Sequence, residues 1–179
     1  MNETQRRWIL RNRTAEAHAI VDAAVGAFDD LDSYKRYLLA TYRFRIPLER
    51  RLENVDWPVG LGEWRPRRIG AQLQADLDDF GLPFPDLEQF DPPLEQSRIY
   101  GALYVLEGSS LGARVLLRRA ETLGLSGDFG ARHLAVLSAG DSWRGFLTQL
   151  EAVQPFDIDL ATSASLDTFA VAAQAFQRD

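Results

Sequence analysis

The chain of 179 residues has the length of one domain that can bury its own hydrophobic core. Its formal net charge of −6 argues against nucleic acid and acidic membrane surfaces as main partners. It contains no cysteine, which excludes disulfides, thiolate-bound metals and a cysteine nucleophile.

Apolar residues recur with helical periodicity along nearly the whole chain, and no segment alternates as a half-buried strand does. We therefore predict an all-α fold with a single domain over residues 1–179. The predicted helices cover about residues 3–28, 33–53, 66–80, 94–123, 132–137, 142–153 and 164–176.

Several residues of known conformational preference mark the ends of these helices. Asp32 has the type of an N-cap for the second helix, and Pro47 should kink it. Gly81 and Gly124 are expected to end the third and fourth helices, and Pro155 should close the sixth. The N-terminal residues lack the apolar core of a signal peptide, and no apolar run approaches the roughly 18 residues of a membrane span. We expect a cytoplasmic protein without membrane contact.

His18 lies on the apolar face of the first helix, and a lone histidine there is ordinarily a buried core residue. Asp22, four residues later, is close enough to orient its imidazole. Arg11, seven residues earlier, projects from nearly the same face. This arrangement also suits a haem whose iron binds His18 and whose propionate binds Arg11.

His133, the only other histidine, stands near a loop and is expected to be partly exposed. A di-iron bundle requires Glu three residues before its histidines. His18 has Ala15 in that place and His133 has Gly130, so this chemistry is disfavoured. A zinc site would need scattered carboxylates, and no Gly-x-Ser-x-Gly elbow supports a serine hydrolase.

Gly108 and Gly112 lie four apart inside a predicted helix, where each costs about 0.5–1 kcal/mol relative to alanine. Such a pair ordinarily allows two helices to pack closely. It also allows a flat ligand to lie against the backbone, with Ser109 and Ser110 holding water beside it. Tyr100, Leu103 and Tyr104, on the two preceding turns, are then expected to line the same pocket.

Three arginines, Arg114, Arg118 and Arg119, follow on the same helix. A solvated helix face is the simplest interpretation of this cluster. It also offers a basic surface to an acidic partner protein.

Three segments together resemble a known family. They are LRNRTAEAHAIVD, YVLEGSSLGARVL and SWRGFLTQLE, which occur in this order between about residues 8 and 153. The combination resembles the bacterial haem oxygenases, especially those associated with bacteriophytochromes. The resemblance implies that His18 is the proximal iron ligand and that Asp22 orients it. It also implies that Arg11 and Arg144 bind the haem propionates.

The second segment implies that a glycine-rich helix bends over the haem at Gly108 and Gly112, and we expect these glycines and Ser109 to serve catalysis. Mammalian members have an aspartate where this chain has Ser109, and many bacterial members have a further glycine where Ala113 stands. A second basic residue of the first segment is replaced by Ala15.

The resemblance implies that haem is both cofactor and substrate, and that O2 and electrons convert it to biliverdin, CO and iron. The implied partners are an electron donor, either a ferredoxin or a reductase, and a bacteriophytochrome that takes the biliverdin. Two alternatives remain open at this point. One is a haem-binding or haem-transfer protein without catalysis, and the other is a different enzyme, such as a thiaminase-like relative, on the same helical scaffold.

Overall fold

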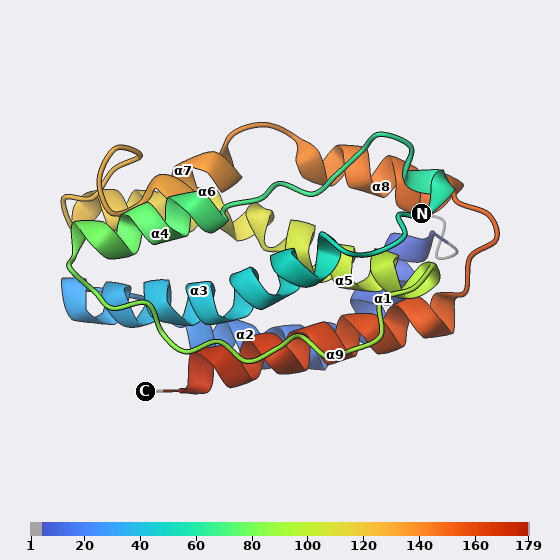
Figure 1. The fold of residues 1–179 in the computed structure, drawn as a ribbon, viewed down its shortest axis with the longest axis horizontal. Coiled ribbons are helices and arrows are strands. Elements are labelled where there is room, and N and C mark those ends of the chain that lie inside the picture. Colours follow the sequence, from blue (N-terminus) through green and yellow to red (C-terminus); the bar gives the residue numbers. More distant parts are fainter. Residues whose placement is uncertain (1–4, 179) are drawn as a thin grey trace.

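The computed structural model describes residues 5–178, and Figure 1 shows an assembly of packed helices. The regular elements are α1 (Arg6–Arg13), α2 (Ala15–Val25), α3 (Leu31–Leu52), the 3₁₀ turn η1 (Val59–Leu61), α4 (Gly70–Asp79), α5 (Ser97–Gly108), α6 (Ser110–Thr122), α7 (Arg132–Ser138), α8 (Ser142–Ala152) and α9 (Ile158–Gln177). These residues contain no β-strand, only isolated bridges near Ser126. The predicted all-α fold is confirmed.

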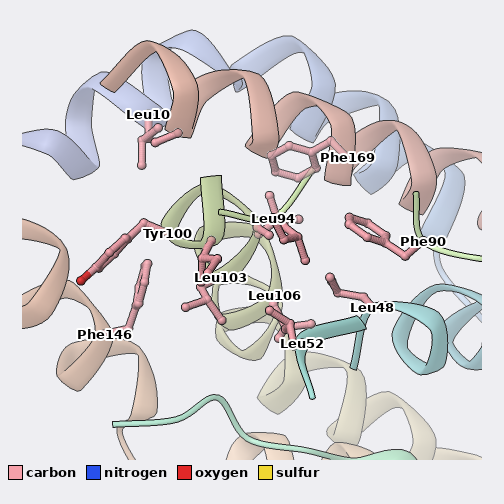
Figure 2. Packing of buried hydrophobic residues seen from close by; sticks show 14 of the residues in the cluster. Leu10, Leu48, Leu52, Phe90, Leu94, Tyr100, Leu103, Leu106, Phe146 and Phe169 are labelled. Carbon is pink, nitrogen blue, oxygen red and sulfur yellow. The ribbon is translucent and has the colours of Figure 1, made fainter. Parts of the chain in front are cut away.

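The main core forms where α5 packs between α3 and α9. Figure 2 shows Leu103 and Leu106 of α5 near Leu48 and Leu52 of α3, with Phe169 of α9 above them. All of these side chains are buried, and their burial supplies the main driving force for the fold. In residues 5–178 we find no helix with the length and apolar character to cross a membrane.

The glycine that brings two helices together is Gly101. A Cβ added there would lie 2.1 Å from the carbonyl oxygen of Ala161 on α9. The backbones of α5 and α9 can therefore approach only because position 101 has no side chain.

The first predicted helix is wrong as a continuous element, because the structure divides it into α1 and α2 at Thr14. Thr14 leaves helical geometry with φ −108° and ψ 5°, and its hydroxyl donates to the carbonyl oxygen of Leu10 at 2.8 Å. A threonine side chain that bonds the backbone competes with regular helix geometry. Residues 3 and 4 of the predicted helix lie outside the described residues.

The predicted long helix over 94–123 is also two helices, with α5 ending at Gly108 and α6 beginning at Ser110. The Ser109 hydroxyl donates to the carbonyl oxygen of Leu106, and the Ser110 hydroxyl donates to that of Glu107, both at 2.6 Å. Serine hydroxyls that bond nearby carbonyls bend helices. Gly108, which has no side chain, gives the helix its most flexible backbone position at this point.

Other helix ends differ by a few residues. Asp30, rather than Asp32, caps α3, since its carboxylate accepts from the Ser33 amide at 2.7 Å. The final helix begins six residues before its predicted start, because the Asp157 carboxylate caps it at Asp159 and Leu160.

Two glycines end their helices as predicted. Gly81 and Gly124 have φ values of +61° and +84°, a conformation that favours glycine.

Candidate functional site

A cavity of about 840 Å³ lies among the helices, within the size range of small-molecule and cofactor sites. Side chains of α1, α2, α3, α5, α6, α7, α8 and α9 line it. It therefore gathers residues from nearly the whole chain, including both helix breaks at Thr14 and Ser109. These breaks are where the structure departs most from the sequence-based expectation.

His18 of α2 lines this cavity and is not a buried core residue, since 59% of its side chain is exposed. Its Nδ1 atom lies 2.9 Å from a carboxylate oxygen of Asp22, which also lines the cavity. The edge of the imidazole meets Phe169, with ring centroids 5.6 Å apart and planes at 72°. Because the carboxylate holds a proton on Nδ1, the Nε2 lone pair is left to bind a ligand.

Gly108 and Gly112 also line the cavity, and close helix packing does not explain them. A Cβ added at Gly112 would meet no described atom within 4 Å, and one at Gly108 would only approach the Trp143 ring at 3.8 Å. The contrast with Gly101, where a Cβ would collide with backbone, is direct. The glycine pair therefore leaves open space on the cavity side of α5 and α6.

Ser109 and Tyr104 line the cavity as well, whereas Tyr100, Leu103 and Ser110 do not. The Ser109 hydroxyl donates its single proton in a hydrogen bond to the Leu106 carbonyl. It can therefore only accept hydrogen bonds from a ligand. Tyr104 packs beside Trp143 with ring centroids 5.6 Å apart. Burial raises the pKa of the Tyr104 hydroxyl, and the positive charge of Arg11, which lines the same cavity, opposes this shift.

Two arginines flank a tryptophan on α1 at one side of the cavity. The guanidinium carbons of Arg7 and Arg11 lie 4.8 Å and 5.2 Å from the centroid of the Trp8 ring, and all three residues line the cavity. The Nε atom of Arg7 is buried and has no hydrogen-bond partner in residues 5–178. A buried guanidinium donor without an acceptor is costly, and a ligand carboxylate would satisfy it.

Arg144 does not line this cavity, so the structure does not bring it together with Arg11 there. Its side chain is 84% exposed and pairs with Asp141 at 3.0 Å. On α8 the neighbouring Trp143 and Leu147 line the cavity instead. Residues one position apart on a helix point about 100° apart, so Arg144 faces away. The sequence signal that we overlooked is the spacing of Arg7 from Arg11, one helical turn.

The structure also places polar residues on the α3 side of the cavity, namely Tyr37, Thr41 and Arg45. The Arg45 guanidinium is buried, pairs with Glu49 at 3.0 Å, and donates to the carbonyl oxygens of Leu106 and Arg67. Its bond to Leu106 holds the end of α5 at the helix break. The sequence reasoning missed these residues because a polar position on an amphipathic helix ordinarily faces solvent.

His133 was expected to be partly exposed, and this expectation is wrong, since its side chain is fully buried. Its Nδ1 atom lies 2.7 Å from a carboxylate oxygen of Asp76, which is also fully buried. The partner lies 57 residues away in the sequence, so no local pattern reveals the pair. Among the described residues we find no group of three or more His, Asp or Glu side chains that could hold a metal ion.

Comparisons with known proteins agree with the geometry. The chain is 31% identical over 165 residues to "Heme oxygenase PigA" of Pseudomonas aeruginosa, covering 87% of this chain and 83% of that protein. It is 35% identical over 128 residues to a "Heme oxygenase" of Xanthomonas campestris pv. campestris, covering 68% of this chain and 74% of that protein.

A solved structure of the heme oxygenase from Neisseria meningitidis, described as NO- and CO-bound, has the same fold. The TM-score is 0.75 at 23% sequence identity, with 98% of this chain and 94% of that chain covered. No profile of a protein family matches the sequence.

Proposed function

The chain belongs to the haem oxygenase family, whose members are enzymes that degrade haem, and we propose that this protein binds haem in the cavity beside His18 and cleaves it to biliverdin, CO and iron. The observation that carries the proposal is that one cavity joins His18 to the open backbone at Gly108 and Gly112. A flat macrocycle with one axial imidazole needs this combination of a nitrogen ligand and a wall without side chains.

The residues that hold the haem follow from their atoms. His18 is proposed to bind the iron through Nε2, since Asp22 occupies its Nδ1. Arg7 and Arg11 are proposed to bind the propionates, because both line the cavity and the Arg7 Nε lacks a partner in the described residues.

The bound haem supplies the iron that activates O2 and the carbon bridge that is oxidised. The protein contributes geometry and polarity around it. Gly108 and Gly112 admit the ring close to the backbone, and Trp143 covers the space beside Gly108. Ser109 is proposed to accept hydrogen bonds from water there, because its own proton is engaged by Leu106. None of these side chains is an acid that would donate a proton early.

The alternative is a haem-binding or haem-transfer protein that does not turn haem over. The engaged hydroxyl of Ser109 is the feature that favours it, because it leaves no free hydroxyl proton at that position. One experiment separates the two. Haem-free protein is mixed with haemin and then supplied with a reductant and air. The proposed enzyme gives a Soret shift and then bile-pigment absorption, whereas a stable Soret band alone supports the alternative. If no Soret shift develops, neither is correct.

An acidic redox protein is proposed as the electron donor, with α6 as its docking surface. Arg114, Arg118 and Arg119 are exposed there, beside Leu111 and Val115, which are 60% and 53% exposed. Leu111 also lines the cavity, so a partner on α6 would sit beside the haem. Charge reversal of Arg114 and Arg118 should slow turnover with a ferredoxin but not with a chemical reductant. An unchanged rate with ferredoxin rejects this surface.

A bacteriophytochrome is proposed as recipient of the biliverdin, and the cytoplasm as the place of the reaction. The resemblance of the three sequence segments supports the phytochrome as recipient. Co-expression with a phytochrome apoprotein should yield a photoactive chromoprotein, and loss of that product in a His18→Ala variant would link it to this cavity.

A further inference from the structure

The pair of His133 and Asp76 is a buried titratable group that the proposed reaction does not yet use. Both side chains are fully buried, and the Asp76 carboxylate oxygen accepts from the backbone amide of His133 at 3.0 Å as well as facing Nδ1 at 2.7 Å. The other carboxylate oxygen accepts from the backbone amide and the guanidinium of Arg132, at 3.0 and 3.1 Å. Both carboxylate oxygens of Asp76 therefore have hydrogen-bond partners, which fix the orientation of the carboxylate.

These contacts determine where the proton of His133 lies. Burial raises the pKa of Asp76, but hydrogen bonds from His133 and Arg132 outweigh it and hold that pKa below its ordinary value, so the carboxyl is ionised. Burial lowers the pKa of His133, and the positive charge of Arg45 adds to this, while Asp76 opposes it. The imidazole is thus neutral, and the ionised carboxylate requires its proton on Nδ1.

The Nε2 atom of His133 is then a buried acceptor, and residues 5–178 offer it no hydrogen-bond donor. Buried polar atoms without a protein partner are usually satisfied by ordered water. The cavity lies next to this part of α7, because Leu134 and Leu137 of the same helix line it. Tyr37 also lines the cavity, and its ring lies 5.9 Å from that of His133, centroid to centroid.

Tyr37 is a polar residue that lies beside this histidine and lines the cavity. Burial raises the pKa of Tyr37 to about 12, so its hydroxyl keeps its proton at neutral pH. A protonated phenol can donate to one partner and accept from another. It can therefore connect a water at Nε2 with groups inside the cavity.

We propose that His133 is a positioning residue, which holds an ordered water on Nε2 and through it orients the Tyr37 hydroxyl at the wall of the haem cavity. Asp76 fixes the imidazole as the Nδ1–H form, so Nε2 accepts from the water, and the water accepts from the Tyr37 hydroxyl. The lone pairs of the Tyr37 oxygen then face the cavity as fixed acceptors. The inference rests on the proposed function only for its effect on turnover, because the hydrogen bonds belong to the haem-free protein.

The first test uses that independence. The chain has only two histidines, so ¹⁵N-histidine labelling of haem-free protein gives imidazole signals that a His18→Ala variant assigns. We expect a protonated Nδ1 and an unprotonated Nε2 for His133, and a shift of the Nε2 signal in Tyr37→Phe with Nδ1 unchanged. A protonated Nε2, or an Nε2 signal indifferent to Tyr37→Phe, overturns the proposal whether or not the protein degrades haem.

The second test separates positioning from packing. Tyr37→Phe keeps the ring, and in His133→Asn the amide nitrogen can replace Nδ1 towards Asp76 while Nε2 is lost. Each should lower kcat about threefold to tenfold, the loss of one hydrogen bond, with haem affinity unchanged. The double variant should be no slower than either single one, since both act through one water. If the two losses of kcat multiply in the double variant, or if a variant weakens haem binding and keeps a normal kcat, the proposal is overturned.

Discussion

The Nδ1 atom of His18 lies 2.9 Å from the carboxylate of Asp22, one turn later on α2, and both side chains line the same cavity. The carboxylate fixes the orientation of the imidazole and makes it a better ligand. Sequence spacing suggested this pair, and the structure adds that the imidazole is open to the cavity instead of buried.

Removal of Asp22 should therefore weaken haem binding without unfolding the protein. We expect Asp22→Ala to lower haem affinity about tenfold, the lower end of the effect seen for groups that orient metal ligands. Spectral titration with haemin measures this. Glu16→Ala, an exposed acidic residue on the same helix, is the matched control and should bind haemin as the wild type does. Equal losses in both variants would show that only the overall charge matters.

The cavity glycines should respond differently from the packing glycine. Gly112→Ala should raise the free energy of unfolding by about 0.5–1 kcal/mol, because the added Cβ meets no described atom within 4 Å and alanine favours helix. Gly112→Phe should fold but bind haemin poorly, since its ring fills the cavity. Gly101→Ala should destabilise the fold because its Cβ meets the Ala161 carbonyl at 2.1 Å. Urea unfolding measures the stability of Gly112→Ala and Gly101→Ala, and haemin titration measures binding by Gly112→Phe. Normal haem affinity in Gly112→Phe contradicts the cavity assignment.

Variants of Arg7, Arg11 and Arg144 should differ in haem affinity according to whether the arginine lines the cavity. Arg7→Gln and Arg11→Gln should each weaken haem binding about tenfold or more, as loss of a charged hydrogen bond to a carboxylate does. Arg144→Gln should have no effect, because Arg144 is exposed and paired with Asp141. The affinities of each variant for haemin and for haemin dimethyl ester distinguish the outcomes, because the ester lacks the free carboxylates that the arginines are proposed to bind. An Arg144 variant that binds haemin weakly would restore the sequence-based expectation.

The stability of the haem-free protein should depend on pH through His133 and Asp76. Burial lowers the pKa of His133 below 6.5, so the unfolded state takes up the proton first as pH falls. This contribution to stability is complete above about pH 6.5 and is lost as pH falls through the lowered pKa. Asp76, whose pKa lies below 3.8 in the folded state, contributes above its unfolded value and loses this at still lower pH.

Urea unfolding between pH 8 and pH 4 measures this dependence. The wild type should lose stability as the pH falls from 7 towards 5, and His133→Asn should lose less over that interval because it lacks the titrating imidazole. The exposed His18 is present in both proteins and cancels in the comparison. Parallel curves for the two proteins would contradict the account of His133.

Local patterns predicted the all-α fold and several of the residues that line the cavity. The contact of His18 with Asp22 follows from their spacing of four residues on α2. Arg11 on α1 and Gly112 on α6 line the same cavity although a helix break separates each from its predicted helix partner. Helix ends marked by Gly81 and Gly124 also followed from the conformational freedom of glycine.

Features that depend on contacts between residues far apart in the chain could not be predicted from the sequence. The break at Ser109 is held by Arg45, which reaches the Leu106 carbonyl from 61 residues away. The burial of His133 depends on Asp76, and the exposure of Arg144 depends on which face α8 turns to the cavity. In each case tertiary packing, not local preference, decides the environment of the side chain.

The most direct test of the central claim is the absorption spectrum of haemin with wild-type protein and with His18→Ala, before and after addition of imidazole. If His18 binds the iron in this cavity, the variant loses the wild-type Soret band, and imidazole, which replaces the missing ligand, restores it. A His18→Ala variant with the wild-type spectrum, and no response to imidazole, would contradict the account.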